Sequence, residues 1–224
     1  MNQLDKNTVP SANQLPENSF ITFDIKNNAQ GLRVLFIGNS ITRHGVKEDI
    51  GWHHDWGMAA SSKEKDYVHL VLSEIRKTNP DASACICQCA EWERLYADKG
   101  VSCLEKFKAA RDFAADIIVV RVIENCDHKE FNREIFLREY KNMINYFNIT
   151  GEAKVVVTTS FWIHPLDEQI RQTAQECGYG LAELGVLGED KKNMAFGLFE
   201  HEGVAMHPGD EGMKAIADAI LEKI

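Results

Sequence analysis

The stretch RVLFIGNSITRHG, residues 33–45, is expected to open the folded part of this chain. Its first half is the apolar run 34–37, which ends abruptly in Gly38, Asn39 and Ser40. A short apolar run that stops at turn residues is typical of a buried strand, so the stretch predicts a strand that surfaces into a loop. A small hydroxyl residue at such a strand end is a candidate nucleophile, although an ordinary turn has the same sequence pattern.

Segments with strand and helix character alternate after this stretch. Strands are predicted at 84–90, 117–120, 155–158 and 180–184, and helices at 64–77, 101–114, 133–147, 167–177 and from Asp210, as N-cap, onward. The run 117–120 is apolar on both faces, as a central parallel strand should be. This alternation predicts an α/β protein in which right-handed crossovers join five parallel strands in a three-layer α/β/α sandwich.

The chain is expected to contain one folded domain, residues 32–224, preceded by an N-terminal arm, residues 1–31. A length of 224 residues with 44% hydrophobic residues suits one ordinary domain with a substantial core. The arm is rich in Asn, Gln, Ser and Pro, and its apolar patch at 20–23 is a candidate edge strand.

Composition argues against several classes of partner. The formal net charge of −9 argues against nucleic acid, because phosphate backbones bind clusters of Lys and Arg. No apolar run approaches the ~18 residues of a membrane span, so no membrane partner is expected. The polar N-terminus lacks the basic-then-apolar order of a signal peptide, and a cytoplasmic location is expected unless a signal was removed. The sequence leaves the oligomeric state open.

The cysteine pattern favours reduced thiols. Three of the six cysteines, Cys85, Cys87 and Cys89, alternate along one predicted strand, so their side chains share a face and rarely bridge one another. Their Cys-x-Cys-x-Cys spacing differs from that of zinc sites. The adjacent residues His53, His54 and Asp55 seldom point to one centre. The sequence therefore indicates no metal and no cofactor.

Polar residues follow the ends of several predicted strands, at the edge of a parallel sheet where ligands bind. Ser40 follows the first strand, Asn125 follows the strand at 117–120, and His207 lies in the loop before the last helix. Ester hydrolysis requires a nucleophile, a base within hydrogen-bond reach of it, and donors for the developing oxyanion. We therefore predict that these three residues form a catalytic site.

Three short blocks resemble the motifs of the SGNH hydrolases, also called the GDSL family. FIGNSIT (36–42) resembles the first block, with Asn39 in place of the usual Asp before the serine. VVRVIEN (119–125) resembles the third block, and MHPGDEGM (206–213) resembles the last. The Gly-x-Ser-x-Gly elbow of the α/β-hydrolases is absent, because Thr42 occupies the position of its second Gly.

The resemblance implies a flavodoxin-like sheet of strand order 2-1-3-4-5 and serine-based cleavage of an ester. Ser40 would be the nucleophile, His207 the base, and the Asn125 amide a donor to the oxyanion. The implied substrate is an acetyl or short acyl ester on a carbohydrate, lipid or related small molecule. Two other functions stay open: a non-catalytic carbohydrate-binding module on the same fold, and acyl transfer to a sugar hydroxyl by the same residues.

The chain departs from the family's second and third blocks. The second block offers a glycine whose N–H joins the oxyanion hole, whereas this chain reads CAEW at 89–92. A backbone N–H at Ala90 or Glu91 is therefore the expected donor. The third block usually has Gly two positions before its Asn, and this chain has Ile123 there.

The largest departure concerns the acid that orients the catalytic histidine. The family commonly places Asp three residues before the histidine, and that position is Val204. Glu202 is the nearest carboxylate along the chain, and a backbone carbonyl is the alternative partner for His207. Loss of the carboxylate lowers the rate by orders of magnitude in serine proteases.

Further residues near the predicted strand ends are candidates for contacts with substrate. They are Asn39, Ala90, Glu91, Glu93, Trp52, Trp56 and Glu124. The two tryptophans belong to an ordered loop at 45–65, where they either wall a sugar pocket or form a packed loop core. The carboxylates bind substrate hydroxyls, form surface salt links, or have a structural role.

Overall fold

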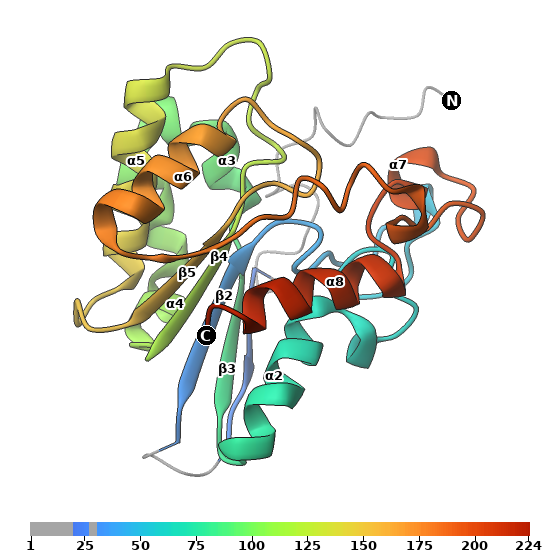
Figure 1. The fold of residues 1–224 in the computed structure, drawn as a ribbon, viewed down its shortest axis with the longest axis horizontal. Helices are drawn as coiled ribbons and strands as arrows, with labels where there is room; N and C mark the ends of the chain where they lie inside the picture. Colours follow the sequence, from blue (N-terminus) through green and yellow to red (C-terminus); the bar gives the residue numbers. More distant parts are fainter. Residues whose placement is uncertain (1–19, 27–30) are drawn as a thin grey trace.

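The fold is seen in a computed structural model, which describes residues 20–26 and 31–224 (Figure 1). Six strands form one sheet of order β1-β3-β2-β4-β5-β6. The strands are β1 (Ile21–Asp24), β2 (Arg33–Gly38), β3 (Ser83–Gln88), β4 (Ile117–Arg121), β5 (Lys154–Thr158) and β6 (Gly180–Ala182). Strands β2 to β6 are parallel, and β1 pairs with β3 in the antiparallel direction.

The arrangement of β2 to β6 confirms the predicted sheet. Numbered as five parallel strands, they have the order 2-1-3-4-5. The sheet differs from the prediction in its strand count, because β1 adds a sixth, antiparallel strand at the edge beside β3. Residues 1–19 and 27–30 of the predicted N-terminal arm lie outside the described residues.

Helices cover both faces of the sheet, which gives the predicted three-layer sandwich (Figure 1). The α-helices are α2 (Tyr67–Thr78), α3 (Ala90–Lys99), α4 (Lys108–Asp112), α5 (Arg133–Phe147), α6 (Asp167–Cys177), α7 (Glu202–Ala205) and α8 (Asp210–Leu221). The 3-10 helices are η2 (Glu48–Ile50), η3 (Lys63–Lys65), η4 (Gly100–Phe107) and η5 (Lys191–Asn193). Helices α3, α5, α6 and η4 cover one face, and α2 and α8 cover the other.

The central strand β2 supplies both cores of the sandwich. Val34 and Phe36 pack in the core under α2 and α8, whereas Leu35 and Ile37 pack in the core under α3 and α5. All four side chains are fully buried. Alternate residues of a strand point to opposite faces, so a strand covered on both sides needs an unbroken apolar run. This requirement explains the apolar run 34–37 in the first half of the stretch 33–45.

The segment after β3 differs from the prediction. We predict a strand that reaches Ala90 and a helix at 101–114, but β3 ends at Gln88 and α3 begins at Ala90. Strong helix formers fill α3, and its Trp92 and Tyr96 lie four residues apart on the buried face. The helix ends at Gly100, and 101–114 is divided between η4 and α4. Two predicted substrate carboxylates therefore lie on the first turn of a helix rather than in a loop.

The segment 45–65 is an ordered loop with a small core of its own. Trp52 is fully buried and packs there with Met58 and Val204. Its indole N–H donates to the backbone carbonyl of His44 at 3.1 Å. Trp52 is predicted either to wall a sugar pocket or to form a packed loop core, and it belongs to a packed loop core.

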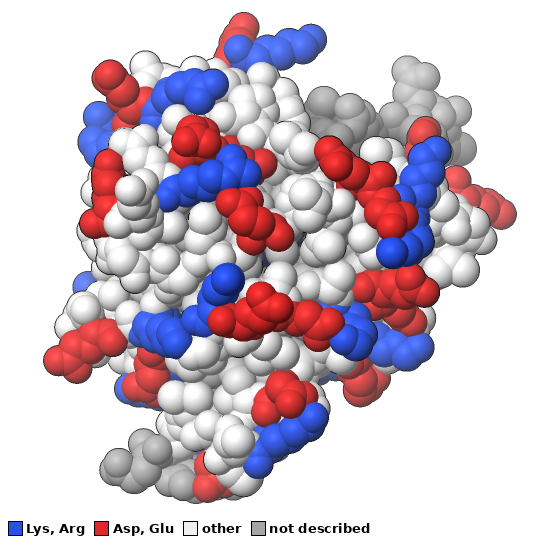
Figure 2. All heavy atoms as spheres, in the orientation of Figure 1, with Lys and Arg blue, Asp and Glu red and all other residues white. Residues whose placement is uncertain are grey.

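Acidic and basic side chains are intermingled on the face of the molecule shown in Figure 2, with no large area of one sign. Many charges are paired, as Arg171 is with Glu183 at 2.8 Å. Within residues 20–26 and 31–224, no helix is long and apolar enough to cross a bilayer.

Candidate active site

The ends of three neighbouring parallel strands bring the predicted residues together. In the strand register, Gly38 at the end of β2 lies between Gln88 at the end of β3 and Arg121 at the end of β4. Ser40 and Ala90 each follow two residues after the end of their strands. The loops that leave these strands therefore share one edge of the sheet, where ligands bind in open parallel sheets.

The turn after β2 requires a glycine at position 38. A Cβ atom there would lie 1.7 Å from Thr42 Oγ1 and 3.0 Å from the carbonyl oxygen of Arg121. Thr42 is itself fixed, because its Oγ1 lies 2.7 Å from the hydroxyl of the buried Tyr67. The tight turn holds Ser40 at the end of the strand.

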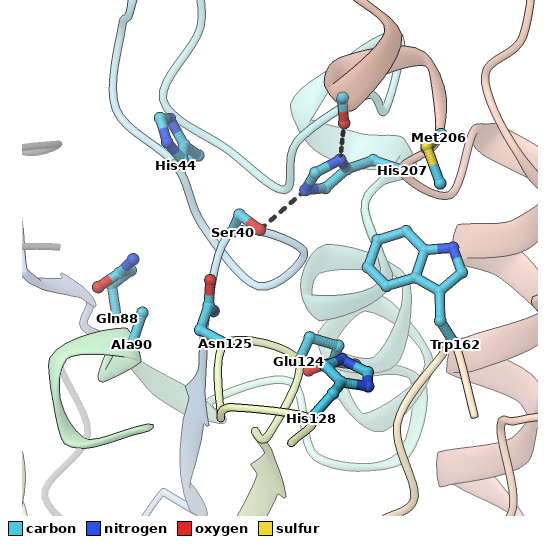
Figure 3. Close-up of a pocket in the computed structure, with 11 residues that line it drawn as sticks. Ser40, His44, Gln88, Ala90, Glu124, Asn125, His128, Trp162, Met206 and His207 are labelled. Carbon is cyan, nitrogen blue, oxygen red and sulfur yellow. Dashed lines mark hydrogen bonds between the residues drawn. The ribbon is translucent and has the colours of Figure 1, made fainter. Parts of the chain in front are cut away.

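Ser40 and His207 are 167 residues apart in the chain and are hydrogen-bonded to each other. The Ser40 Oγ lies 2.8 Å from His207 Nε2 (Figure 3). The His207 ring is buried, and Trp162 packs against it edge to face, with ring centroids 5.5 Å apart. A distance of this size allows proton transfer between a nucleophile and its base.

The other ring nitrogen of His207 faces a backbone carbonyl. Its Nδ1 lies 2.6 Å from the carbonyl oxygen of Gly203 in α7 (Figure 3). When Nδ1 carries the hydrogen and donates it to this carbonyl, Nε2 is unprotonated and can accept the proton of the serine hydroxyl. The side chain of Glu202 is exposed, and that of Val204 is fully buried. Of the two predicted orienting groups, the carbonyl is the one beside the ring.

The loop 45–65 packs against helix α7. Val204 packs with Trp52 in the small core of that loop. Trp52 therefore packs against helix α7, which precedes His207, and is not among the residues that line the pocket beside Ser40. Trp56 is partly buried against the same small core, and its indole N–H donates to the carbonyl of Ala60 at 2.9 Å.

The start of α8 is tied to the same loop. We predict Asp210 as the N-cap of this helix, but the N-cap is Gly209 and Asp210 is the first helical residue. The Asp210 carboxylate accepts hydrogen bonds from the backbone N–H of Ser61 at 2.8 Å and from its hydroxyl at 2.7 Å. These contacts fix the chain immediately after His207.

Two groups of hydrogen-bond donors border Ser40 on the side away from His207. Ala90, the first residue of α3, lines the pocket beside Ser40 (Figure 3). The first N–H groups of a helix have no intrahelical acceptor and carry partial positive charge. Asn125 also lines the pocket; its Nδ2 donates to Glu93 Oε2 at 2.6 Å, and its Oδ1 accepts from Arg94 Nη2 at 3.4 Å. The amide has a second N–H beyond the one that Glu93 accepts.

A buried group of charges and amides lies next to the Ser40 turn. The guanidinium of Arg121 donates to the two oxygens of Glu124, at 2.6 and 3.1 Å, and to Asn39 Oδ1. The amide nitrogen of Asn39 donates to Glu124 at 2.6 Å and to Glu93 at 3.0 Å. Glu124 is therefore the ion-pair partner of Arg121, and the two carboxylates share the Asn39 amide, with the Arg121 side chain fully buried and the Glu124 side chain nearly so.

The two carboxyls of this group differ in proton affinity. Burial, and then the charge of Glu124, raise the pKa of Glu93 to about 7 against the hydrogen bonds that favour its ionised form. Burial alone would raise the pKa of Glu124, but the charge of Arg121 and hydrogen bonds from Phe161 and Asn39 lower it. Glu124 is thus the counter-ion of Arg121, and Glu93 is the carboxyl that titrates near neutral pH.

A pocket with a volume of about 270 Å³ opens beside Ser40. It is lined by Ser40, His207, Asn125, Ala90 and Glu124, and by six residues outside the predicted site, namely Trp162, His128, Gln88, His44, Gly203 and Met206. Trp162 and His128 lie in the loops after β5 and β4. The loops that follow parallel strands form the ligand-binding edge of such a sheet, so this position is the signal by which the two residues could have been found. Gln88 is buried, and its amide has no hydrogen-bond partner within the described part of the chain.

The three carboxylates predicted to contact substrate do not present unbonded oxygens to the pocket. Glu91 accepts a hydrogen bond from Lys106 and is not among the pocket-lining residues. Glu93 is buried and faces Asn39 and Asn125. Glu124 borders the pocket, but both of its oxygens accept hydrogen bonds from neighbouring protein groups.

The structure of this chain is similar to solved structures of esterases and of a GDSL-like lipase. No protein-family model and no curated protein matches it. An acetyl xylan esterase matches with a TM-score of 0.56 at 17% identity, over 86% of this chain and 100% of its own. A protein assigned as a GDSL-like lipase, from Parabacteroides merdae, matches with a TM-score of 0.57 at 14% identity, over 89% and 98%.

A two-domain esterase active on acetylated mannans matches with a TM-score of 0.53 at 15% identity, over 85% of this chain. Only 48% of that esterase is covered, so this chain spans about half of its length. These matches identify the architecture as the SGNH/GDSL hydrolase fold, which the three sequence blocks predict. At identities of 14 to 17% the likeness is one of fold.

Proposed function

We propose that this protein is a serine hydrolase that cleaves an acetyl or other short acyl ester on a carbohydrate or related small molecule. The observation that carries the proposal is the 2.8 Å contact between Ser40 Oγ and His207 Nε2 at the pocket. A serine hydroxyl is a weak nucleophile unless a base takes its proton as it attacks. A buried histidine at hydrogen-bond distance supplies that base.

The reaction follows from these two groups. Ser40 Oγ attacks the acyl carbon while its proton moves to His207 Nε2, and the carbonyl oxygen becomes an oxyanion. The protonated imidazole then gives its proton to the leaving alcohol oxygen as the ester C–O bond breaks. Water, deprotonated by the same nitrogen, hydrolyses the acyl-serine and restores both groups.

We expect three donors beside Ser40 to stabilise the oxyanion. They are the backbone N–H of Ser40, the backbone N–H of Ala90 at the start of α3, and the second N–H of the Asn125 amide. Ala90 and Asn125 both line the pocket. Fixed donors in a site that excludes water supply a large part of the rate enhancement in acyl transfer.

The carbonyl of Gly203 replaces the carboxylate of a Ser-His-Asp triad in one of its two tasks. It holds the ring by accepting from Nδ1 at 2.6 Å. A carbonyl dipole stabilises the imidazolium less than a full negative charge does, so we expect a dyad with a lower rate than a triad.

The pocket favours a short acyl group. A volume of about 270 Å³ accommodates an acetyl group and part of an alcohol, but not a long lipid chain. Trp162 lies beside His207, the group that protonates the leaving alcohol (Figure 3). An aromatic ring in this position offers a flat apolar surface to a sugar on the leaving-group side.

The deciding experiment compares wild-type protein with Ser40→Ala on 4-nitrophenyl acetate and on acetylated xylan. We expect Ser40→Ala to lower kcat by about 10³-fold or more, and Asn125→Ala to lower it by about 10²–10³-fold. Ser102→Ala, at an exposed surface serine, is the matched control and should leave kcat unchanged. Absence of Ser40-dependent release from either ester would exclude esterase activity on them and favour a binding module, and release that rises with added acceptor sugar would indicate acyl transfer.

A further inference from the structure

We propose that Glu93 is a positioning residue for this reaction: its ionised carboxylate holds the Asn125 amide in the orientation that serves the oxyanion, and a proton on Glu93 releases that amide. The inference rests on the proposed function of Asn125. Glu93 lies on the first turn of α3, and its carboxylate joins this helix to the loops that follow β2 and β4.

The contacts of Glu93 are all with hydrogen-bond donors. Its Oε1 accepts from the Asn39 amide at 3.0 Å, from the backbone N–H of Ile123, and more weakly from the backbone N–H of Asn125 at 3.5 Å. Its Oε2 accepts from Asn125 Nδ2 at 2.6 Å. An ionised carboxylate accepts only, so four N–H groups around two oxygens fit the ionised form and leave no acceptor for an added proton.

The orientation of the Asn125 amide follows from this arrangement. Glu93 faces its Nδ2, and the guanidinium of Arg94 faces its Oδ1 at 3.4 Å. A proton on Glu93 Oε2 would point at Nδ2, so the amide would turn over to present its oxygen instead. The turned amide would place its NH₂ against the Arg94 guanidinium, donor against donor. Protonation therefore exchanges a well-matched arrangement for a poorly matched one and removes the oriented N–H from the oxyanion.

Burial and the charges that face Glu93 set the pH at which Glu93 is protonated and the Asn125 amide turns. Glu124 and Arg121 face the Glu93 side chain from the end of β4 through the Asn39 amide, Cys126 lies in the following loop, and Arg94 on its own helix reaches Asn125. Arg121 is already neutralised by Glu124 at 2.6 Å. Burial and the second negative charge of Glu124 thus place the pKa of Glu93 at about 7, within the range in which esterases are assayed.

The first test is the pH profile of ester hydrolysis from about pH 5 to 9. Wild-type activity requires both an unprotonated His207 and an ionised Glu93, so the acid limb of log(kcat/KM) should approach a slope of about 2. In Glu93→Gln we expect a slope of about 1, a kcat lowered roughly 10- to 100-fold, and little change in KM. Glu93→Asp should keep the steep slope. Asp98→Asn, at an exposed carboxylate on the same helix, should match wild type. A wild-type slope and kcat in Glu93→Gln, with the fold intact by circular dichroism, would overturn the proposal.

The second test does not depend on activity. The side-chain amide signals of Asn125 in ¹⁵N-labelled protein, assigned by their loss in Asn125→Asp, should move with pH about a midpoint near 7 in wild type and in Ser40→Ala. They should stay fixed in Glu93→Gln. Signals that do not respond to pH in wild type would disprove the positioning role even in an active esterase. A response in a protein without Ser40-dependent activity would instead count against the proposed function alone.

Discussion

Ile123 adopts a backbone conformation that residues with a side chain rarely take. Its φ angle is +112°, and the residue is fully buried in the core beneath α3 and α5. Ile123 lies two residues before Asn125, and its backbone N–H donates a hydrogen bond to Glu93. The family usually has glycine here, and the structure shows the reason, because the turn that presents Asn125 needs a positive φ. The chain retains this turn with a β-branched residue, at a cost of about 1–3 kcal/mol in strain.

This conformation reverses a common order of stability. At negative φ, Gly is less stable than Ala by about 0.5–1 kcal/mol because glycine loses more backbone entropy on folding. At the φ of Ile123 we expect Ile123→Gly to be more stable than Ile123→Ala by about 1 kcal/mol, although both lose the buried side chain and are less stable than wild type. Urea denaturation of the three proteins measures the difference. If Ile123→Ala proved the more stable variant, the positive φ would be wrong.

At the scale of elements, the short helix α7 supplies the group that faces the second ring nitrogen of His207. Val204 occupies the position of the family's Asp, but its side chain is fully buried in the apolar core of the loop 45–65. The carbonyl of Gly203 takes the place beside the His207 ring. The apolar side chain and the carbonyl are therefore parts of one arrangement, in which Val204 anchors the helix that carries the acceptor.

Restoring the acid should therefore fail. In Val204→Asp the carboxylate enters the apolar core with Trp52, away from His207, and a buried unpaired carboxyl costs several kcal/mol. We expect a melting temperature about 5–10 °C lower, no gain in kcat, and partial recovery of stability at low pH, where the carboxyl is protonated. Val204→Asn removes the charge at the same size and should be less destabilising at neutral pH. A gain in kcat with Val204→Asp would show that the side chain reaches the histidine.

The elements that could be predicted from sequence are those whose signal is local. The apolar runs of β2, β4 and β5 mark buried parallel strands, and the helical stripes of α2, α5 and α8 mark their covers. The sequence does not predict helix α3, because its apolar residues continue directly from β3, with Cys89 alone between strand and helix. In a short apolar run, hydrophobic periodicity alone does not distinguish a strand from a helix.

The supporting contacts of the site could not be predicted for a different reason. Every residue has a carbonyl, so nothing in the sequence marks Gly203 as the group beside His207. The role of Trp52 depends on its contact with Val204, about 150 residues later in the chain. Glu93 reads as a surface carboxylate until the loop after β4 closes over it. Such contacts arise from tertiary structure, and local pattern does not carry them.

At the scale of the whole molecule, the core between the sheet and helices α3 and α5 excludes water from five of the six thiols. All six cysteines are free, and only Cys177 at the end of α6 is exposed. Cys85 and Cys87 share the core face of β3, as their alternation predicts. Burial raises the pKa of Cys103 to about 11 and raises those of Cys85, Cys87 and Cys126 well above their usual value.

A thiol titration tests the packing of this core. Thiol reagents react with the exposed thiolate, so 5,5′-dithiobis(2-nitrobenzoate) should modify one cysteine of the native protein rapidly and all six in denaturant. Cys177→Ser should remove the rapid phase without changing the melting temperature. The five slow thiols should then react only as the sandwich opens, so their rate rises with urea in parallel with unfolding. Two or more rapid thiols in the native protein would mean that the core beneath α3 and α5 is open to solvent, and a total below six in denaturant would reveal a disulfide.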